Sequence, residues 1–455
     1  MKTDGQTAAL VEWVGDLRFD ALDAATRHAA RRHALDTIGV IVAGAGSSLT
    51  AKVVSLLPEI AGPVAVPGLG RGFPLLDAAY VGGCAGHGLE LDDGYRLGSV
   101  HPGVAVVPAA IALAQTETVD GAAFLRALVC GYQAVASVSR AGHPRLRRRG
   151  FHPTGAVGVL GSAVASSCLL GLDAATMTNA IGVSASAAAG LFAFVGGGAD
   201  VKRLHAAHAA REGVWAALLA RRGVEGPPAV LEAADGFLIA FSGSNQPAIA
   251  LPSGPGDFGI EDCYIKPHPC CRHLQPALEA MLALVEAHSL TVDDIEKVEV
   301  ETYAIAASHA RTPWNSMASA QLSFPYILML GLRYGAVELR HFDKAVLADP
   351  AFERLAAKID IRASAEMDGL YPAQRPARVI VHSRKGRHEV FRGEALGSRE
   401  WPLSDEGVSE KFLRLVAPVC GERVARDVLD RLWDIETVRD VGMVLRRLSE
   451  PAMRQ

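Results

Sequence analysis

Apolar positions in the first 250 residues recur with the spacing of helices. A stripe of apolar residues that ends in glycine predicts a helix over 21–44. Another is predicted over 120–142, where Asp120 is a suitable N-cap. Segments 173–190 and 205–223 continue the pattern. Because these segments are rich in alanine and glycine, we expect the helices to be stabilised by packing against one another more than by intrinsic propensity.

The pattern changes after residues 242–259, whose sequence SGSNQPAIALPSGPGDFG predicts a linker. A helix at about 274–288 is followed by a capped turn in TVDDIEK and by a half-buried strand in KVEVETY. The runs ARVIVHS and RHEVFRGE, joined by the turn residues RKG, predict a hairpin. From about residue 405, SEKFLRLVAPVC and VARDVLDRLW are helical again.

This order of elements predicts a mainly α protein with a smaller α+β domain. We expect residues 1–258 and 400–455 to form a large all-helical domain, which the C-terminal segment completes. Residues 259–399 would form an inserted α+β lid domain. Two domains also agree with the length of 455 residues, which exceeds what one hydrophobic core usually supports.

Amino-acid composition limits which kinds of binding partner and which cellular compartment we expect. A net charge of −4 gives no reason to expect nucleic acid. The seven cysteines form no C-x-x-C motif, and no signal peptide is evident, so we expect a reduced, cytoplasmic protein. Asp173 is the only charged residue between Pro153 and Ala199, and so few charges could suggest membrane-spanning helices. However, Gly, Ala and Ser dominate this segment, so insertion into a membrane would be weakly favoured. Buried helices are therefore expected there, with no membrane partner.

Four separated stretches combine charge with core-like surroundings. They are ELDDGYRLGSVHPG (90–103), GFHPTG (150–155), GGGADVKRLHAAHAAREG (196–213) and YIKPHPCCRH (264–273). Each alone is compatible with a solvated loop, a turn before a helix or a structural histidine. Together they supply lysines and arginines that can hold carboxylates, and histidines that can move protons. That combination suits chemistry at a carbon next to a carboxylate, where a base removes a proton and cations stabilise the enolate.

Three other sequence patterns give weaker evidence for a functional site. The basic run RLRRRG (145–150) is either a solvated rim or an attractor for an acidic substrate. His205 and His208 share a helix face but supply only two ligands, so no metal is expected. The glycines at 196–198 and 68–72 match neither G-x-G-x-x-G nor a P-loop, so no nucleotide is expected.

The four stretches, with ASAQLSFPY (318–326) as a fifth, resemble successive blocks of the MmgE/PrpD family. This family includes 2-methylcitrate dehydratase, cis-aconitate decarboxylase and iminodisuccinate epimerase. HGLELDDGYRLGSVHPG is similar to the family's acidic D-[FY]-D-D segment, which is followed by HP and an apolar helix. The resemblance implies a large helical domain with a smaller α+β lid, a homodimer, and no metal or organic cofactor.

The resemblance also implies site residues. Lys202 and Lys266 would hold substrate carboxylates or stabilise the enolate, and His101 and His152 would be the acid and the base. Tyr326 would donate a hydrogen bond or a proton, and Asp93 would orient a histidine or the loop. The expected substrate-binding residues are Glu90, Arg203, Cys271 and Arg272.

Three positions depart from the family pattern. Glu90 replaces its first aspartate, Gly94 replaces a frequent hydroxyl residue, and Cys271 stands where some members have histidine. The expected activity is a cofactor-independent lyase on a small di- or tricarboxylate, foremost a hydro-lyase of the 2-methylcitrate dehydratase type. An epimerase of a substituted dicarboxylate and a cis-aconitate-type decarboxylase remain alternatives, as does a non-catalytic carboxylate-binding protein.

Overall fold

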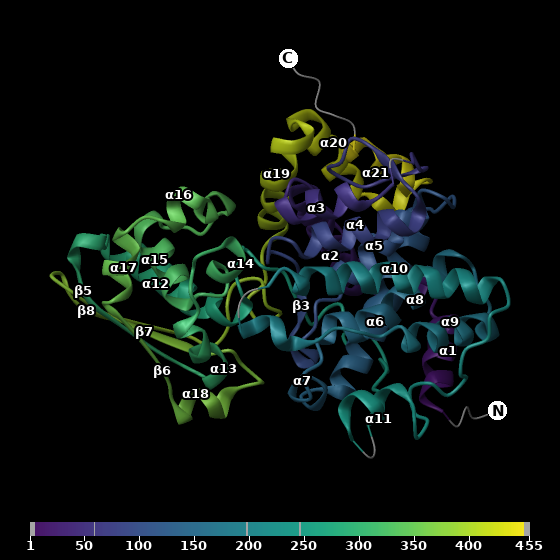
Figure 1. Ribbon diagram of the computed structural model, residues 1–455, viewed down its shortest axis with the longest axis horizontal. Coiled ribbons are helices and arrows are strands. Elements are labelled where there is room, and N and C mark those ends of the chain that lie inside the picture. The colour runs from purple at the N-terminus through teal and green to yellow at the C-terminus, as the bar shows by residue number, and fades with distance from the viewer. Residues whose placement is uncertain (1–4, 59, 197–198, 245–246, 450–455) are drawn as a thin grey trace.

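The computed structural model describes residues 5–58, 60–196, 199–244 and 247–449. It contains a helical lobe and a smaller α+β lobe, which lie side by side (Figure 1). The linker expected at 242–259 and the glycines at 196–198 fall partly outside these residues, at 245–246 and 197–198. The mainly α architecture with a smaller α+β part is confirmed.

The helical lobe contains the N-terminal helices and three helices that follow the α+β lobe in the chain. Its helices are α1 (Gln6–Asp16), α2 (Ala24–Ala45), α3 (Ser48–Leu56), α4 (Leu75–His87), α5 (Gly103–Ala114), α6 (Gly121–Gly142), α7 (Arg145–Arg148), α8 (Pro153–Leu169), α9 (Ala174–Ser186), α10 (Val201–Arg221), α11 (Phe237–Ser242), α19 (Asp405–Cys420), α20 (Glu422–Trp433) and α21 (Val441–Arg446). Two short antiparallel pairs accompany them: β1 (Val64–Ala65) with β2 (Gly72–Phe73), and β3 (Gly94–Tyr95) with β4 (Cys263–Tyr264).

The predicted helix ends are close to the observed ones, because capping side chains define them. Asp120 accepts a hydrogen bond from the backbone N–H of Ala123 at 2.8 Å and begins α6. Asp23 does the same for Thr26 at 2.7 Å and begins α2. Small residues let the helices approach closely. A Cβ added to Gly83 in α4 would lie 2.8 Å from the Cα of Ala207 in α10.

One helix among the described residues, α6, is long and apolar enough to cross a membrane. Its apolar stretch is 83% buried inside the protein. The helices α2 and α3 are also long and apolar enough if they are taken together as one span, but they are bent by 75° relative to each other. In the apolar segment 153–199, α8 is buried along nearly its whole length, as expected of a core helix.

The α+β lobe is built on a four-stranded sheet with the order β6-β5-β7-β8. Its elements are α12 (Gln275–His288), β5 (Ile295–Thr302), α13 (Ala304–Ala307), α14 (Met317–Ala320), α15 (Phe324–Tyr334), α16 (Lys344–Leu347), α17 (Ala351–Ala356), β6 (Ile359–Ala363), α18 (Ala365–Leu370), β7 (Ala377–Ser383) and β8 (Gly386–Arg392). The expected hairpin is β7–β8, paired from Ala377↔Arg392 to Ser383↔Gly386. The sequence did not predict β6, which pairs parallel to β5.

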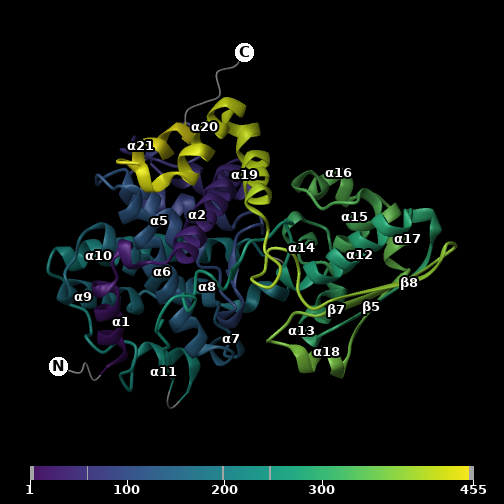
Figure 2. The same ribbon diagram turned by 180° about the vertical axis from the view of Figure 1, so that it is seen from behind.

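Each lobe has its own hydrophobic core. The core of the helical lobe runs from Leu10 to Ile265 and resumes from Val408 to Leu448. The core of the α+β lobe runs from Cys270 to Val381, with α12 between the sheet and α15. The chain therefore leaves the helical lobe and returns to it, and α19–α21 pack on the N-terminal helices (Figure 2). The boundaries proposed at 258/259 and 399/400 stay predictions.

The returning helix α19 reaches the centre of the helical lobe. Buried Lys411 of α19 forms an ion pair with buried Asp36 of α2. Its Nζ also donates a hydrogen bond to the carbonyl oxygen of Leu91 at 2.8 Å. A residue near the end of the chain thus supports the acidic segment that follows α4.

Candidate active site

The acidic segment lies buried between the lobes and holds two lysines. Glu90 has φ of 54°, an uncommon left-handed conformation for a residue with a side chain. Its carboxylate accepts a hydrogen bond from Lys202 Nζ, which lies in the first turn of α10. Lys266 Nζ lies 3.6 Å from Glu90 Oε2 and 3.5 Å from Asp92 Oδ1, and it donates to the Glu90 carbonyl at 3.3 Å. Two carboxylates and two ammonium groups therefore form one buried cluster.

Mutual attraction keeps this cluster charged. Burial alone would raise the pKa of Glu90, but Lys202 and Lys266 outweigh it and hold that pKa below its ordinary value. Burial opposes the charge of Asp92 too, yet Lys266 and the neighbouring histidines hold its pKa well below the usual range. Burial would lower the pKa of Lys266, and the two carboxylates raise it instead. At neutral pH the cluster thus contains two carboxylates and a protonated Lys266.

Asp92 also orients two imidazoles. Its Oδ2 lies 2.9 Å from Nδ1 of His87 and 3.0 Å from Nδ1 of His101. His101 Nδ1 is also 2.6 Å from the carbonyl oxygen of Asp93. Because these partners accept hydrogen bonds, they favour a proton on Nδ1 of His101 and leave Nε2 for the substrate.

His152 belongs to a second pair of imidazoles. It caps the start of α8, and its Nδ1 lies 3.0 Å from Nδ1 of His205 in α10, so one ring donates and the other accepts. Burial, followed by the positive charge of neighbouring groups, holds the pKa of His152 well below its ordinary value. His152 is therefore a neutral imidazole that can accept a proton.

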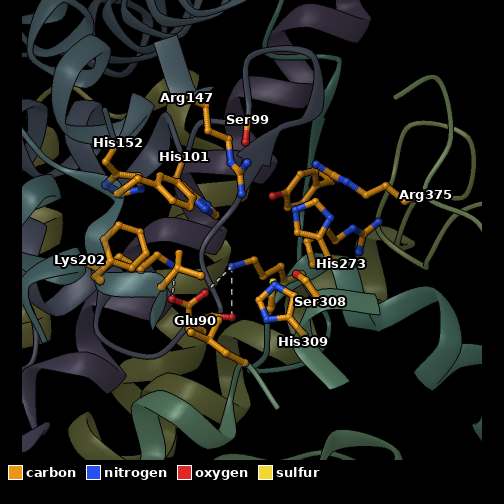
Figure 3. A pocket seen from close by; sticks show the side chains of 18 residues that line it. Glu90, Ser99, His101, Arg147, His152, Lys202, His273, Ser308, His309 and Arg375 are labelled. Carbon is orange, nitrogen blue, oxygen red and sulfur yellow. Dashed lines mark hydrogen bonds and ion pairs between the residues drawn. The ribbon is translucent and has the colours of Figure 1, made fainter. Parts of the chain in front are cut away.

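Glu90, both lysines, His101 and His152 face a cavity between the two lobes (Figure 3). The cavity has a volume of about 110 Å³ and is open to solvent on one side. The lining residues are Glu90, Ser99, His101, Arg147, His152, Phe192, Phe194, Val195, Lys202, Tyr264, Lys266, Cys271, Arg272, His273, Ser308, His309, Leu322 and Arg375. Five of these residues are lysines or arginines and one is a carboxylate, so the cavity favours an anion.

Cys271 and His309 form a further pair in the cavity wall. Burial would raise the pKa of the Cys271 thiol, but the hydrogen bond and charge of His309 lower it. Burial would lower the pKa of His309, and the same thiol raises it. The pair thus favours thiolate and imidazolium.

Seven of the ten residues predicted for the site line this cavity. They are Glu90, His101, His152, Lys202, Lys266, Cys271 and Arg272. Asp93 lies behind the wall, where its carboxylate accepts from the backbone N–H of Gly103 at 3.0 Å and from the Tyr132 hydroxyl at 2.7 Å. It fixes the start of α5, in keeping with an orienting role.

Arg203 and Tyr326 lie elsewhere. Arg203 donates to the Gly88 carbonyl at 3.0 Å and to the Gln321 side chain at 3.2 Å, so it joins the lobes behind the cavity. Tyr326 is fully buried in the α+β core, and its hydroxyl donates to the His341 carbonyl at 2.6 Å. The structure therefore does not support Tyr326 as a donor to substrate, because its proton is already used within the core.

The sequence alone did not select several residues of the site. His87 and Asp92 lie within quoted stretches but had no distinct role, and His309 and Arg375 lie in segments without a recognisable motif. Arg147 comes from the basic run 145–150. It lines the cavity, whereas Arg145, Arg148 and Arg149 are exposed. The run thus contains both a solvated rim and a residue placed to attract an anion.

No three His, Cys, Asp or Glu side chains are arranged to hold a metal ion in the part of the chain that the structure describes. His205, considered as a ligand, is instead the partner of His152. The expectation of a reaction without cofactor stays a prediction.

Comparison with known families agrees with the order of the blocks. Residues 8–250 match the MmgE/PrpD N-terminal domain, and residues 268–435 match the MmgE/PrpD C-terminal domain. The chain belongs to the MmgE/PrpD family. The match to the C-terminal domain extends into α19 and α20, which pack in the helical lobe of this MmgE/PrpD protein.

Curated MmgE/PrpD relatives are similar over nearly the whole chain. A cis-aconitate decarboxylase-like protein of Aspergillus oryzae is 27% identical, with 97% of each chain covered. A cis-aconitate decarboxylase of Aspergillus terreus is 26% identical over 98% of this chain and 96% of its own. The mouse cis-aconitate decarboxylase is 25% identical over 93% and 89%, respectively. A decarboxylase is a lyase, so the Aspergillus terreus and mouse relatives are lyases.

Proposed function

We propose that this protein is a lyase for a small polycarboxylate, and that it decarboxylates an unsaturated tricarboxylate of the cis-aconitate kind. The observation that carries the proposal is the cavity between the lobes. His101, His152, Lys202 and Lys266 converge there around a buried carboxylate cluster. The relatives support the decarboxylase version, because three of them have cis-aconitate decarboxylase in their names.

The chemistry requires an anion site and one proton. Decarboxylation breaks the bond between a carboxylate carbon and the carbon skeleton, and the electron pair of that bond stays on the skeleton. In an unsaturated substrate this pair forms a new double bond, while the old double bond takes up a proton at carbon. Lys202 and Lys266 would hold substrate carboxylates and stabilise the negative charge that develops on the skeleton.

The two cavity histidines suit different roles. His101 would deliver the proton, because Asp92 and the Asp93 carbonyl hold its ring through Nδ1 and leave Nε2 for the substrate. His152, with its lowered pKa, is neutral at rest and would accept a proton or donate a hydrogen bond. Restoring the proton on His101 from solvent completes the cycle.

Dehydration of a hydroxy-tricarboxylate of the 2-methylcitrate type is the second candidate. It is favoured by the same pair of imidazoles in different environments, because dehydration needs a base for the proton at carbon and an acid for the leaving hydroxyl. Both reactions would occur at one cavity, so product analysis separates them.

Proton NMR in D₂O with cis-aconitate, 2-methylcitrate, citrate, malate and substituted succinates tests the proposal. Loss of the cis-aconitate vinylic signal with release of carbon dioxide and one deuterium at carbon is expected. New vinylic signals from a hydroxy acid without carbon dioxide would select dehydration. Exchange with unchanged connectivity and scrambled stereochemistry would select an epimerase. No exchange with any compound would overturn the proposal.

Matched variants assign the reaction to the cavity. His101→Gln and His152→Gln should each lower turnover by about 10²- to 10⁴-fold while the protein stays folded. His382→Gln is the control, because His382 bonds to Glu299 on the sheet at 2.8 Å and does not line the cavity. Equal loss of turnover in all three variants would contradict the assignment.

A further inference from the structure

The two ends of the cavity differ in how their cations are paired. At the lysine end, Lys202 and Lys266 have Glu90 and Asp92 as partners. Arg147 and Arg375 lie away from this cluster and form the arginine end (Figure 3). Neither guanidinium has a carboxylate oxygen within 4 Å among residues 5–58, 60–196, 199–244 and 247–449.

Arg375 is the more constrained of the two. It is 4% exposed, and its Nε is buried without a hydrogen-bond partner in the described structure. Its guanidinium lies 5.1 Å from the centroid of the Tyr264 ring, and the guanidinium of Arg272 lies 4.7 Å from the same ring. Two like charges thus share one aromatic ring.

Burial would lower the pKa of Arg375, but nearby tyrosines and Glu394 raise it, although none of them forms an ion pair with it. Arg272 has its own acceptors, since it donates to the carbonyl oxygens of Ala395 at 2.8 Å and Leu396 at 2.7 Å. Glu394 acts on Arg375 electrostatically, but it forms its ion pair with Arg96. Arg375 forms no side-chain hydrogen bond with the residues that the structure describes, so its terminal N–H groups are left for a ligand.

Arg147 approaches the cavity from the helical lobe. It lies in α7, and its guanidinium is 4.3 Å from the centroid of the Phe192 ring. Arg147 forms no side-chain hydrogen bond or ion pair with the described residues, so its N–H donors are available. Arg375 comes from the α+β lobe, so an anion bound to both arginines would connect the two lobes.

A buried charge without a partner is costly, and a planar guanidinium matches a carboxylate through two parallel hydrogen bonds. We propose that Arg375 and Arg147 form a second carboxylate subsite, which binds the end of the substrate opposite the carboxylate held by Lys202 and Lys266. This inference rests on the proposed function for the reacting end. It restricts the substrate to compounds with carboxylates at both ends and makes Arg375 a specificity-determining residue.

Calorimetric titration with tricarballylate tests the subsite without turnover, because this saturated tricarboxylate has neither a hydroxyl to lose nor a double bond to shift. Arg375→Gln and Arg147→Gln should each weaken binding by about 10- to 100-fold. The same substitutions should change the binding of a tricarballylate monoamide, which lacks one terminal carboxylate, much less. Kinetically, Arg375→Gln should raise KM for a tricarboxylate more than it lowers kcat.

Arg392→Gln is the matched control. The Nε of Arg392 is also buried without a partner, and its guanidinium lies 5.4 Å from the Trp401 ring, but Arg392 does not line the cavity. Tricarballylate should bind this variant as it binds the wild type. Circular dichroism verifies folding, and if Arg375→Gln does not fold, Arg147→Gln in the partly exposed α7 decides the question.

Unchanged tricarballylate affinity in a folded arginine variant would overturn the subsite, as would the absence of binding to the wild type. Neither result depends on turnover. Conversely, binding that depends on Arg375 together with no proton exchange in D₂O would retain the subsite and reject the proposed lyase.

Discussion

The lysine end and the arginine end of the cavity show two ways to hold positive charge next to a substrate. At the lysine end, Glu90 and Asp92 compensate Lys202 and Lys266, so the charges are stable before a substrate arrives. At the arginine end, Arg375 lies against the Tyr264 ring and has no ion-pair partner among the residues that the structure describes. The difference indicates that the first end is part of the folded framework, whereas the second gains its partner from the ligand.

Removing one cation from each end tests this difference most strongly. Lys266→Met leaves two buried carboxylates with one fewer cation, so the free energy of unfolding should fall by about 3–5 kcal/mol. Arg147→Met removes no ion pair, so the free energy of unfolding should fall by about 1 kcal/mol or less. Chemical denaturation followed by circular dichroism measures both. Equal losses would contradict the distinction between the two ends.

Acid should destabilise the protein through histidines near the lysine end. Burial lowers the pKa of His87 from 6.5 to about 4. The unfolded chain therefore binds a proton in this window that the folded chain does not. Stability due to His87 is present above pH 6.5, is lost as the pH falls towards 4, and amounts to about 3 kcal/mol.

Denaturation at several pH values between these limits measures the effect. His87→Gln should make the dependence shallower without abolishing it, because burial also lowers the pKa of His143 and His152. His382→Gln should keep the wild-type profile. A free energy of unfolding that does not change across the window would show that His87 becomes protonated in the folded state.

A smaller effect is expected in the reactivity of the Cys271 thiol. Since His309 lowers the pKa of its thiol, iodoacetamide should alkylate Cys271 at a lower pH than it alkylates Cys270, whose pKa burial raises. Peptide mapping identifies the modified cysteine. His309→Gln should move the reaction to higher pH, and tricarballylate should slow it. Alkylation of Cys271 that is independent of His309 would contradict the pair.

Much of the fold followed from local patterns. Capped helices such as 120–142 and the β7–β8 hairpin depend on residues close in sequence, so their elements were predicted to within a few residues. β6 was missed although Ile359–Ala363 alternates apolar and polar residues, because the run is only five residues long and none of its side chains is fully buried. Its parallel pairing with β5 establishes it as a strand.

The site was predictable only where chemistry and local motif coincide. His101, His152 and the two lysines lie in distinctive stretches. Tyr326 was misplaced because α15 is buried on nearly all sides, so its sequence does not show which face meets a cavity. The sequence around Arg375 contains no motif that indicates a binding site. The role of Arg375 depends on the missing carboxylate partner and on Tyr264, more than a hundred positions away in the sequence.

The contact of Lys411 with the Leu91 carbonyl has a consequence for the order of synthesis. The acidic segment leaves the ribosome early, but the side chain that supports it emerges only after the whole α+β lobe has been made. That lobe has its own core and can fold while it waits, since domains generally fold as units. The helical lobe must remain open for α19, so the cavity between the lobes is among the last features that a newly made chain completes.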